Sequence, residues 1–201
     1  MSGGDYAAMV ILPRLAAFVA AEAPGVDLRF RFVEKDQVDG LIDTGGLDLA
    51  LGVFPNAPKR MALQAVFEER FVCVAARHNP GISGELTLAA FVALPHLLVT
   101  ERGDAVGAVD EALARQGLRR RVALTVPHVL VVPAVLPGST MVATVGARVA
   151  RMFAASAALA VHDTPVQMPA WRLSILTARQ KAGDSGLEWL RQAIARIGAG
   201  V

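Results

Sequence analysis

The sequence predicts an α/β fold, and three observations support this expectation. Two short runs, residues 47–54 and 71–76, are almost entirely apolar, as strands covered on both faces are. Segments with helical periodicity lie between and beyond these runs, and glycine or proline ends most of them. Helices that alternate with strands indicate largely parallel sheets. The 201 residues suffice for one large domain or two small lobes.

Helices are expected where apolar residues recur every three to four positions and a turn signal follows. The first runs over residues 7–22, with Asp5 placed to cap it and Pro24–Gly25 to end it. The last covers residues 187–197 and is amphipathic. The other predicted helices are residues 37–44, 88–93, 105–116, 129–136 and 147–155.

Strands are expected at runs with a period of two or at short apolar runs. Residues 27–33 alternate polar and apolar side chains, which is typical of a half-buried strand. The remaining predicted strands are residues 47–54, 71–76, 96–100, 119–126, 141–145 and 172–177.

Charge is nearly balanced, with 20 Lys and Arg against 18 Asp and Glu. A DNA-binding domain usually carries a clustered basic surface, which this pattern does not predict. The run Arg119–Arg120–Arg121 is interpreted as the solvated start of a strand. The single cysteine, Cys73, excludes an intramolecular disulfide and is interpreted as a small buried apolar residue.

The long apolar run near the N-terminus, residues 7–23, is interrupted by Pro13 and Arg14 and is too short to span a membrane. Met1 is followed by Ser-Gly-Gly-Asp, which does not fit a signal peptide. We therefore expect a cytoplasmic protein that does not bind membranes.

Catalytic signatures are absent from the sequence, which has no G-x-S-x-G, G-x-G-x-x-G, P-loop or H-E-x-x-H motif. The four histidines are scattered, and only His128, beside Pro127 at a strand-to-helix turn, is expected near a pocket. Trp171 and Trp189 are interpreted as packing residues. We expect no enzyme activity, no metal and no cofactor, although a small α/β enzyme remains an alternative.

A series of short motifs occurs in a characteristic order along the whole chain. The motifs are residues 5–15 (DYAAMVILPRL), 23–26 (APGV), 46–52 (GLDLALG), 67–74 (FEERFVCV), 78–80 (HNP), 86–91 (LTLAAF), 141–148 (MVATVGAR) and 189–191 (WLR). In this order and spacing the chain resembles the effector-binding domain of LysR-type transcriptional regulators. Residues 71–73 and 126–128 resemble the branch that contains nodulation regulators and regulators of aromatic-acid catabolism.

The resemblance implies the fold of a type 2 periplasmic binding protein, with two Rossmann-like α/β lobes joined by two crossover strands. Residues 1–72 and 173–201 would form lobe I, and residues 73–172 lobe II. In such folds the ligand lies between the lobes, near strand C-termini and helix N-termini. The winged helix-turn-helix of the family is not in this chain, so DNA binding would belong to the parent protein alone.

The resemblance also implies an effector site. Arg148 matches an arginine that pairs with the ligand carboxylate in relatives that respond to aromatic acids, although Gly146 replaces a usual proline nearby. Gly4 and Asp5 open the first helix, where backbone N–H groups can hold a carboxylate. Glu69 stands where some relatives have a histidine, and an acid there would repel an anionic ligand. The remaining expected contacts are Ile11, Phe67, Val106, His128 and Ala170.

One family feature is expected to be missing: only Met1-Ser2-Gly3 precedes Gly4 and Asp5, where the family has its first strand. Unpaired backbone groups in a sheet are costly. Lobe I is therefore expected to be loosened or to be completed by another chain.

The sequence as a whole predicts the ligand-sensing and oligomerisation domain of a LysR-type regulator. It is expected to bind a small molecule, an aromatic or organic acid, between its lobes and to form a homodimer. The open alternatives are a solute-binding protein of a transporter and a truncated regulator fragment that binds no ligand.

Overall fold

The computed structural model describes residues 1–100, 106–156 and 158–201. The chain divides into two compact units. The first unit comprises Met1–Glu69 and Trp171–Val201, and the second comprises Arg70–Ala170. The first unit is therefore built from two separate stretches of sequence. Helices and strands occur in both units, which confirms the predicted α/β class.

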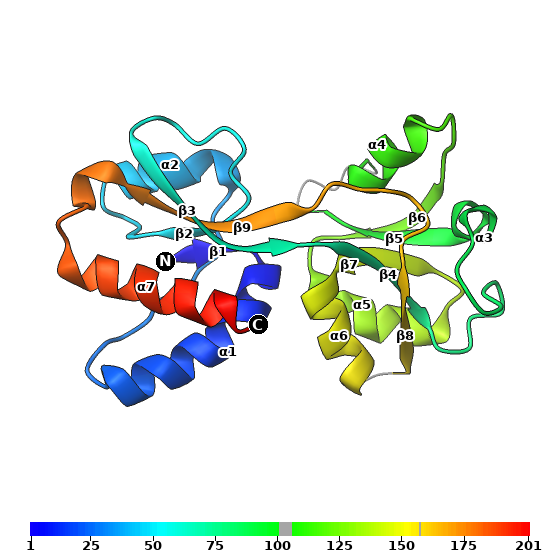
Figure 1. Cartoon of the computed structure of the whole chain (residues 1–201), viewed down its shortest axis with the longest axis horizontal. Coiled ribbons are helices and arrows are strands. Elements are labelled where there is room, and N and C mark those ends of the chain that lie inside the picture. Colours follow the sequence, from blue (N-terminus) through cyan, green and yellow to red (C-terminus); the bar gives the residue numbers. More distant parts are fainter. Residues whose placement is uncertain (101–105, 157) are drawn as a thin grey trace. The chain divides into compact units, whose positions relative to one another are not determined.

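The first unit contains a four-stranded sheet in the order β1-β2-β9-β3 (Figure 1). Its strands are β1 (Ser2–Gly3), β2 (Ala50–Gly52), β9 (Trp171–Ala178) and β3 (Met61–Glu69). β1 runs parallel to β2, whereas β9 is antiparallel to both of its neighbours. The returning strand thus lies inside the sheet of the first unit, and most of its residues are buried.

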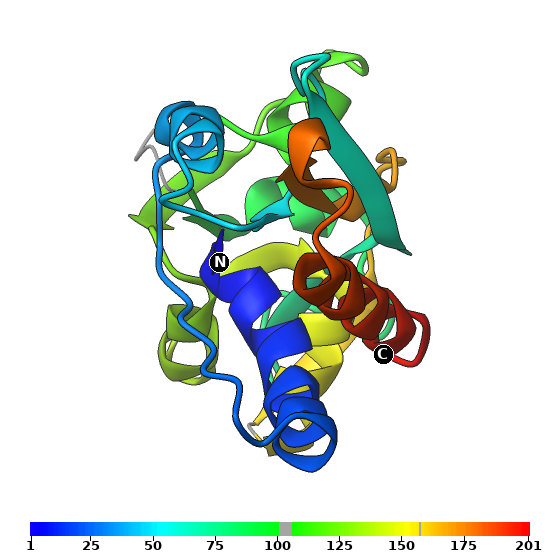
Figure 2. The ribbon, with the colours of Figure 1, turned by 90° about the vertical axis from the view of Figure 1, so that its left-hand side faces the viewer.

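Helices cover both faces of this sheet. α1 (Asp5–Glu22) and α7 (Ser185–Ala199) lie side by side on one face (Figure 2), where Phe18 and Trp189 pack with their ring centroids 5.7 Å apart. α2 (Lys35–Asp43) covers the other face, with Val38 and Ile42 in a core that includes Leu176 of β9. The short 3-10 helix η3 (Arg179–Lys181) links β9 to the segment before α7.

The second unit contains a five-stranded sheet in the order β6-β5-β7-β4-β8. Its strands are β4 (Phe71–Ala76), β5 (Pro95–Val99), β6 (Arg121–Val126), β7 (Val142–Gly146) and β8 (Leu159–Asp163). β5 is parallel to β6 and β7, but β4 is antiparallel to β7 and β8. Both sheets are mixed, so the expectation of largely parallel sheets was wrong. Each sheet contains one inner strand, β9 or β4, that is antiparallel to the strands on both of its sides, and this makes the sheet mixed.

The helices of the second unit also lie on both faces of its sheet (Figure 1). α3 (Leu88–Ala93) and α4 (Ala108–Ala114) pack on the face that presents Cys73, Ala75 and Val142. α6 (Ala147–Ser156) and α5 (Val132–Val135), the latter between the 3-10 helices η1 (Val129–Val131) and η2 (Leu136–Gly138), lie on the other face. The helix predicted at residues 105–116 is observed from Ala108 onward, and Ala105 lies outside the described residues.

The first strand was expected to be missing, and this expectation was wrong. β1 is present, although it has only two residues, and its backbone forms hydrogen bonds with chain segments on both of its sides. The Ser2 N–H donates to the Leu49 carbonyl at 3.0 Å, and the Gly3 N–H donates to the Arg31 carbonyl at 3.3 Å. Because β1 is so short, residues 27–33 make only an isolated bridge at Arg31 and not the predicted strand.

The start of α1 also differs from the prediction. Gly4 and not Asp5 is the N-cap residue, and its side chain offers no cap; Asp5 is the first helical residue. A carboxylate in the first turn still interacts favourably with the helix dipole. β3 and β8 were not predicted; both lie at sheet edges, where one side is solvated and the apolar pattern is weaker.

Candidate functional site

Three polar or aromatic side chains of the first unit form an aromatic–carboxylate cluster: Tyr6, Glu69 and Trp171. Glu69 is the last residue of β3 and lies opposite Trp171 of β9 in the strand register. Its side chain is almost fully buried, with 1% of the residue exposed. The Tyr6 hydroxyl, from the first turn of α1, donates a hydrogen bond to Glu69 Oε2. The rings of Tyr6 and Trp171 meet edge to face, with centroids 4.9 Å apart at 67°.

This cluster contains one predicted site residue, Glu69, and two residues that were not predicted to belong to the site. Tyr6 and Trp171 are separated by most of the chain, and no spacing pattern links them. Gly4 and Asp5 lie directly before Tyr6 at the start of α1, where the first backbone N–H groups have no partner within the helix. The backbone N–H donors at the start of α1 are therefore next in sequence to Tyr6, a residue of the cluster.

Ile11 and Phe67 are core residues of the first unit. Ile11 has no exposed surface, and Phe67 is also buried, on β3 near Gly198 of α7. That Ile11 and Phe67 contact a ligand stays a prediction.

In the second unit, two predicted site residues follow the carboxyl ends of parallel strands. His128 is an exposed residue two positions after the end of β6, and Arg148 is a half-buried residue two positions after the end of β7. β5 lies between these strands and is parallel to both. Because parallel strands end at the same edge of a sheet, His128 and Arg148 both follow strands that end at one edge.

The other two predicted residues of the second unit lie elsewhere on its surface. Val106 follows β5 in sequence and is 64% exposed. It lines a surface cavity of about 530 Å³ together with Asp110, Leu118 and Arg120. Ala170 is exposed and is the last residue of the second unit.

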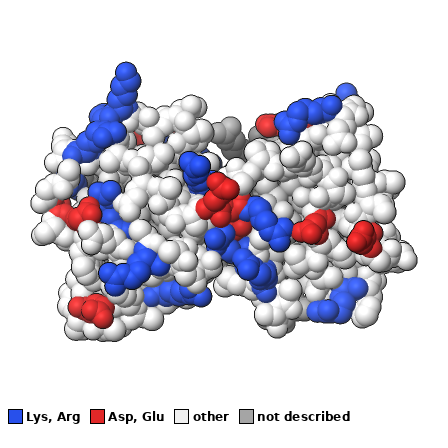
Figure 3. Space-filling view, in the orientation of Figure 1, with Lys and Arg blue, Asp and Glu red and all other residues white. Residues whose placement is uncertain are grey.

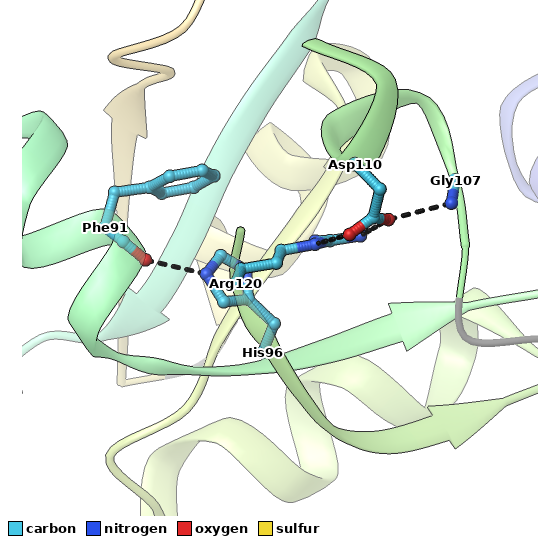
Figure 4. A network of polar contacts seen from close by, with 5 residues as sticks. All are labelled: Phe91, His96, Gly107, Asp110 and Arg120. Carbon is cyan, nitrogen blue, oxygen red and sulfur yellow. Dashed lines mark hydrogen bonds and ion pairs between the residues drawn. The ribbon is translucent and has the colours of Figure 1, made fainter. Parts of the chain in front are cut away.

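A buried polar network lies beside this cavity and was not foreseen (Figure 4). Arg120 Nε donates to Asp110 Oδ1 at 2.9 Å, and Arg120 Nη2 donates to Asp110 Oδ2 at 2.6 Å. Arg120 Nη1 lies 3.2 Å from His96 Nδ1, and His96 Nε2 lies 2.7 Å from the Phe91 carbonyl oxygen. A neutral imidazole with its proton on Nε2 satisfies both of these contacts.

The network explains the titration of its members. Burial lowers the pKa of His96 to about 4, because a charged imidazolium is poorly solvated there and also faces Arg120. Burial alone would raise the pKa of Asp110, but hydrogen bonds from Arg120 and from the Gly107 N–H outweigh it and lower that pKa. The Arg120 side chain is only 1% exposed, so its interpretation as a solvated residue was wrong, whereas Arg119 and Arg121 are exposed.

Two further features bear on chemistry. Burial raises the pKa of the Cys73 thiol to about 12, which makes it a poor nucleophile and confirms its interpretation as a buried apolar residue. Within residues 1–100, 106–156 and 158–201, no group of three or more His, Cys, Asp or Glu side chains is placed to hold a metal ion.

Each unit carries Lys and Arg interspersed with Asp and Glu on the face in Figure 3, without one continuous basic area. None of the helices in the described part of the chain has the length and apolar character needed to cross a membrane.

Comparison with known proteins identifies relatives over almost the whole chain. It is 26% identical to the HTH-type transcriptional activator NagR of Ralstonia sp over 96% of its length, covering 64% of that protein. It is 29% identical to Nodulation protein D 1 of Rhizobium leguminosarum bv. phaseoli over 96% of its length, covering 61% of that protein. The chain thus spans less than two thirds of the length of these curated relatives, which are named for regulation or nodulation and not as enzymes.

A solved structure and a protein family give the same assignment. The regulatory domain of MexT, a transcriptional activator in Pseudomonas aeruginosa, superposes with a TM-score of 0.87 at 28% identity, and 98% of this chain and 97% of that chain are covered. The family described as LysR substrate binding domain matches residues 2–198. The chain therefore belongs to the LysR substrate-binding domain family and has the type 2 periplasmic-binding fold of LysR regulatory domains.

Proposed function

We propose that this chain senses an aromatic or organic acid for a LysR-type transcriptional regulator and does not catalyse a reaction. The observation that carries the proposal is the edge of the second sheet, where His128 and Arg148 follow the carboxyl ends of β6 and β7. Ligands of open α/β sheets bind at the carboxyl ends of strands. The resemblance to regulators of aromatic-acid catabolism supports the choice of ligand class.

Arg148 is the proposed partner of the effector carboxylate. A planar guanidinium binds a carboxylate through two parallel hydrogen bonds, a contact that contributes roughly 1.5–3 kcal/mol. The backbone N–H groups that follow Gly4 and Asp5 at the start of α1 supply further donors. In this proposal the ligand lies in the cleft between lobe I (residues 1–72 and 173–201) and lobe II (residues 73–172). The other contacts would come from Ile11, Phe67, Glu69, Val106, His128 and Ala170.

The signal would be a shift between open and closed arrangements of the two lobes, which requires that the ligand bind one of them more tightly. The parent regulator would be cytoplasmic, would form homodimers and would bind DNA through an N-terminal helix-turn-helix domain outside this chain.

A thermal-shift screen of carboxylates tests the proposal. An acid at about one hundred times its Kd stabilises a protein by roughly 2.7 kcal/mol, which raises the Tm of a chain of this size by about 5–10 °C. We expect Arg148→Ala to abolish the shift and Arg148→Lys to weaken it. Arg151→Ala, an exposed arginine on the same helix, is the control and should keep the shift. The absence of any shift with all acids, or a full shift in Arg148→Ala, would contradict the proposal.

A further inference from the structure

We propose that the surface cavity of the second unit is a binding site for an α-amino acid with an apolar side chain, in its zwitterionic form. The cavity has a volume of about 530 Å³, within the range of about 300–1,000 Å³ that ligand pockets have. The lining residues that the structure describes all lie between positions 106 and 120, so the site belongs to the second unit alone. It shares Val106 with the predicted effector contacts but does not rest on the proposed sensing function.

The cavity exists because the chain reverses direction at the end of α4. Gly117 has a φ of +68°, a left-handed conformation that glycine adopts without strain. The Leu118 N–H donates to the Leu113 carbonyl at 3.0 Å, a hydrogen bond typical of a glycine-terminated helix. The lining residues come from α4, from the segment just before it and from residues 117–120 just after it. Local structure therefore fixes the walls.

Two of the four charged residues described in the lining, Asp110 and Arg120, neutralise each other. The Asp110 carboxylate accepts hydrogen bonds from Arg120 through both oxygens and a further one from the Gly107 N–H (Figure 4). The Arg120 side chain is almost fully buried and also contacts His96. This pair forms a rigid wall of the cavity and adds no net charge to it.

The other two charged residues of the lining are Glu111 and Arg119, and both are exposed. Within residues 1–100, 106–156 and 158–201, neither side chain makes an ion pair or a hydrogen bond. One negative and one positive charge thus line the same cavity without pairing with each other. A ligand with a single charge is attracted by one of them and repelled by the other, whereas a zwitterion presents the opposite charge to each.

Apolar side chains in the lining favour an apolar group on the ligand. Val106 is the most exposed of the large apolar side chains in the described part of the chain. Leu118 is half-buried and packs against the core of the second unit, and Ala114 is exposed on α4. Covering these side chains removes apolar surface from water, which favours binding. An apolar α-amino acid combines such a group with an ammonium and a carboxylate.

Three probes that share a phenyl group test the site. They are L-phenylalanine, 3-phenylpropionate, which lacks the ammonium, and 2-phenylethylamine, which lacks the carboxylate. Titration calorimetry at pH 7 measures the Kd of each probe for the unmodified chain. We expect L-phenylalanine to bind about fivefold more tightly than either of the other two, the scale of one exposed ion pair. Equal binding of the three probes, or no binding of L-phenylalanine, would overturn the proposal.

Variants then assign each charge of the ligand to its partner. In Glu111→Gln, L-phenylalanine should exceed 3-phenylpropionate by about twofold or less, because the ammonium has lost its partner. In Arg119→Gln, it should exceed 2-phenylethylamine by about twofold or less. Arg115→Gln, an exposed arginine at the end of α4 that does not line the cavity, is the control and should keep both preferences. Preferences that survive in Glu111→Gln and Arg119→Gln, or that are also lost in Arg115→Gln, would contradict the assignment.

Two further measurements locate the ligand. The methyl resonances of Val106 and Leu118 should shift as L-phenylalanine is added, and Arg148→Ala should leave its Kd unchanged. Loss of binding in Arg148→Ala would place L-phenylalanine in the proposed effector site and overturn the cavity site, while the sensing function stands. Conversely, if L-phenylalanine binds in a way that depends on Glu111 and Arg119 but no carboxylate gives an Arg148-dependent thermal shift, the cavity site stands and the sensing proposal is wrong.

Discussion

Asp110 accepts hydrogen bonds from Arg120 through both carboxylate oxygens and accepts a third from the Gly107 N–H at 2.8 Å. One carboxylate thus joins the start of α4 to the residue that precedes β6 (Figure 4). The same arginine contacts His96 of β5. The network therefore ties a helix to two parallel strands of the second unit.

Replacing Arg120 by Met should destabilise the second unit by about 3–5 kcal/mol. The change leaves the Asp110 carboxylate and the His96 ring without their shared donor, and breaking a half-buried or buried ion pair from one side has this cost. Urea unfolding followed by circular dichroism measures the effect. Arg119→Ala, at the exposed neighbouring position, should stay within about 0.5 kcal/mol of the unmodified chain. Equal losses in the two variants would contradict the role of the network.

The stability of the chain should fall as the pH is lowered from about 6.5 to 4, because of His96. Its pKa in the folded state is about 4, below the usual 6.5, so the unfolded chain binds a proton over this range while the folded chain does not. The stabilisation is complete above about 6.5, and roughly 2 kcal/mol of it is lost by pH 5. Below about pH 3.8 protonation of Asp110 adds a further loss, since the pKa of this carboxyl is lowered in the folded state.

Urea unfolding at pH 7 and pH 5 measures this dependence. His96→Gln should remove most of the difference, because glutamine does not titrate. His128→Gln, at an exposed position, is the control and should keep it. A pH dependence that is unchanged in His96→Gln would show that other groups cause it.

Cys73 should be inert in the folded chain. Its thiol is fully buried on β4, and burial raises its pKa to about 12, so almost no thiolate is present at pH 8. An aromatic disulfide reagent should label it only after unfolding, at a rate that rises with urea concentration. Rapid labelling in the absence of denaturant would mean that the core of the second unit opens readily.

Gly198→Ala should destabilise the first unit by about 1–3 kcal/mol. A Cβ at this position of α7 would overlap the Val66 side chain and lie 3.1 Å from the Val66 carbonyl oxygen of β3. Gly183→Ala is the control, since a Cβ there meets nothing within 4 Å. Thermal unfolding of both variants measures the difference, and a wild-type Tm for Gly198→Ala would show that α7 can move away from β3 at little cost.

Elements whose signals are local were predicted well. The strand at residues 71–76 and the helix at residues 88–93 have the expected bounds, since the apolar run forms the strand itself and the cap residue Thr87 directly precedes the helix. The strand at residues 27–33 was wrong because its formation depends on a partner, and β1 offers only two residues. Edge strand β3 was missed because half of its side chains face solvent.

The candidate site shows the same division. The family resemblance named Glu69 but not Tyr6 or Trp171, which join it only because α1, β3 and β9 meet in the fold. Arg120 and its neighbours look alike in sequence, yet one is buried and two are exposed. A charged side chain is buried where a partner of opposite charge is available, and the partner of Arg120 is Asp110, ten residues away on another element. The sequence around Arg120 therefore does not show that this side chain is buried.

The sequence by itself determined the α/β class, the family, and most helices and central strands of this protein. The helices and strands depend on periodicity and caps, which involve residues close together in the sequence, and the family depends on the order of short motifs along the chain. The tertiary structure decided the mixed direction of the sheets, the aromatic–carboxylate cluster and the His96–Arg120–Asp110 network. Each of these depends on contacts between distant segments, whose geometry is set by packing and burial of the whole unit and by no local pattern.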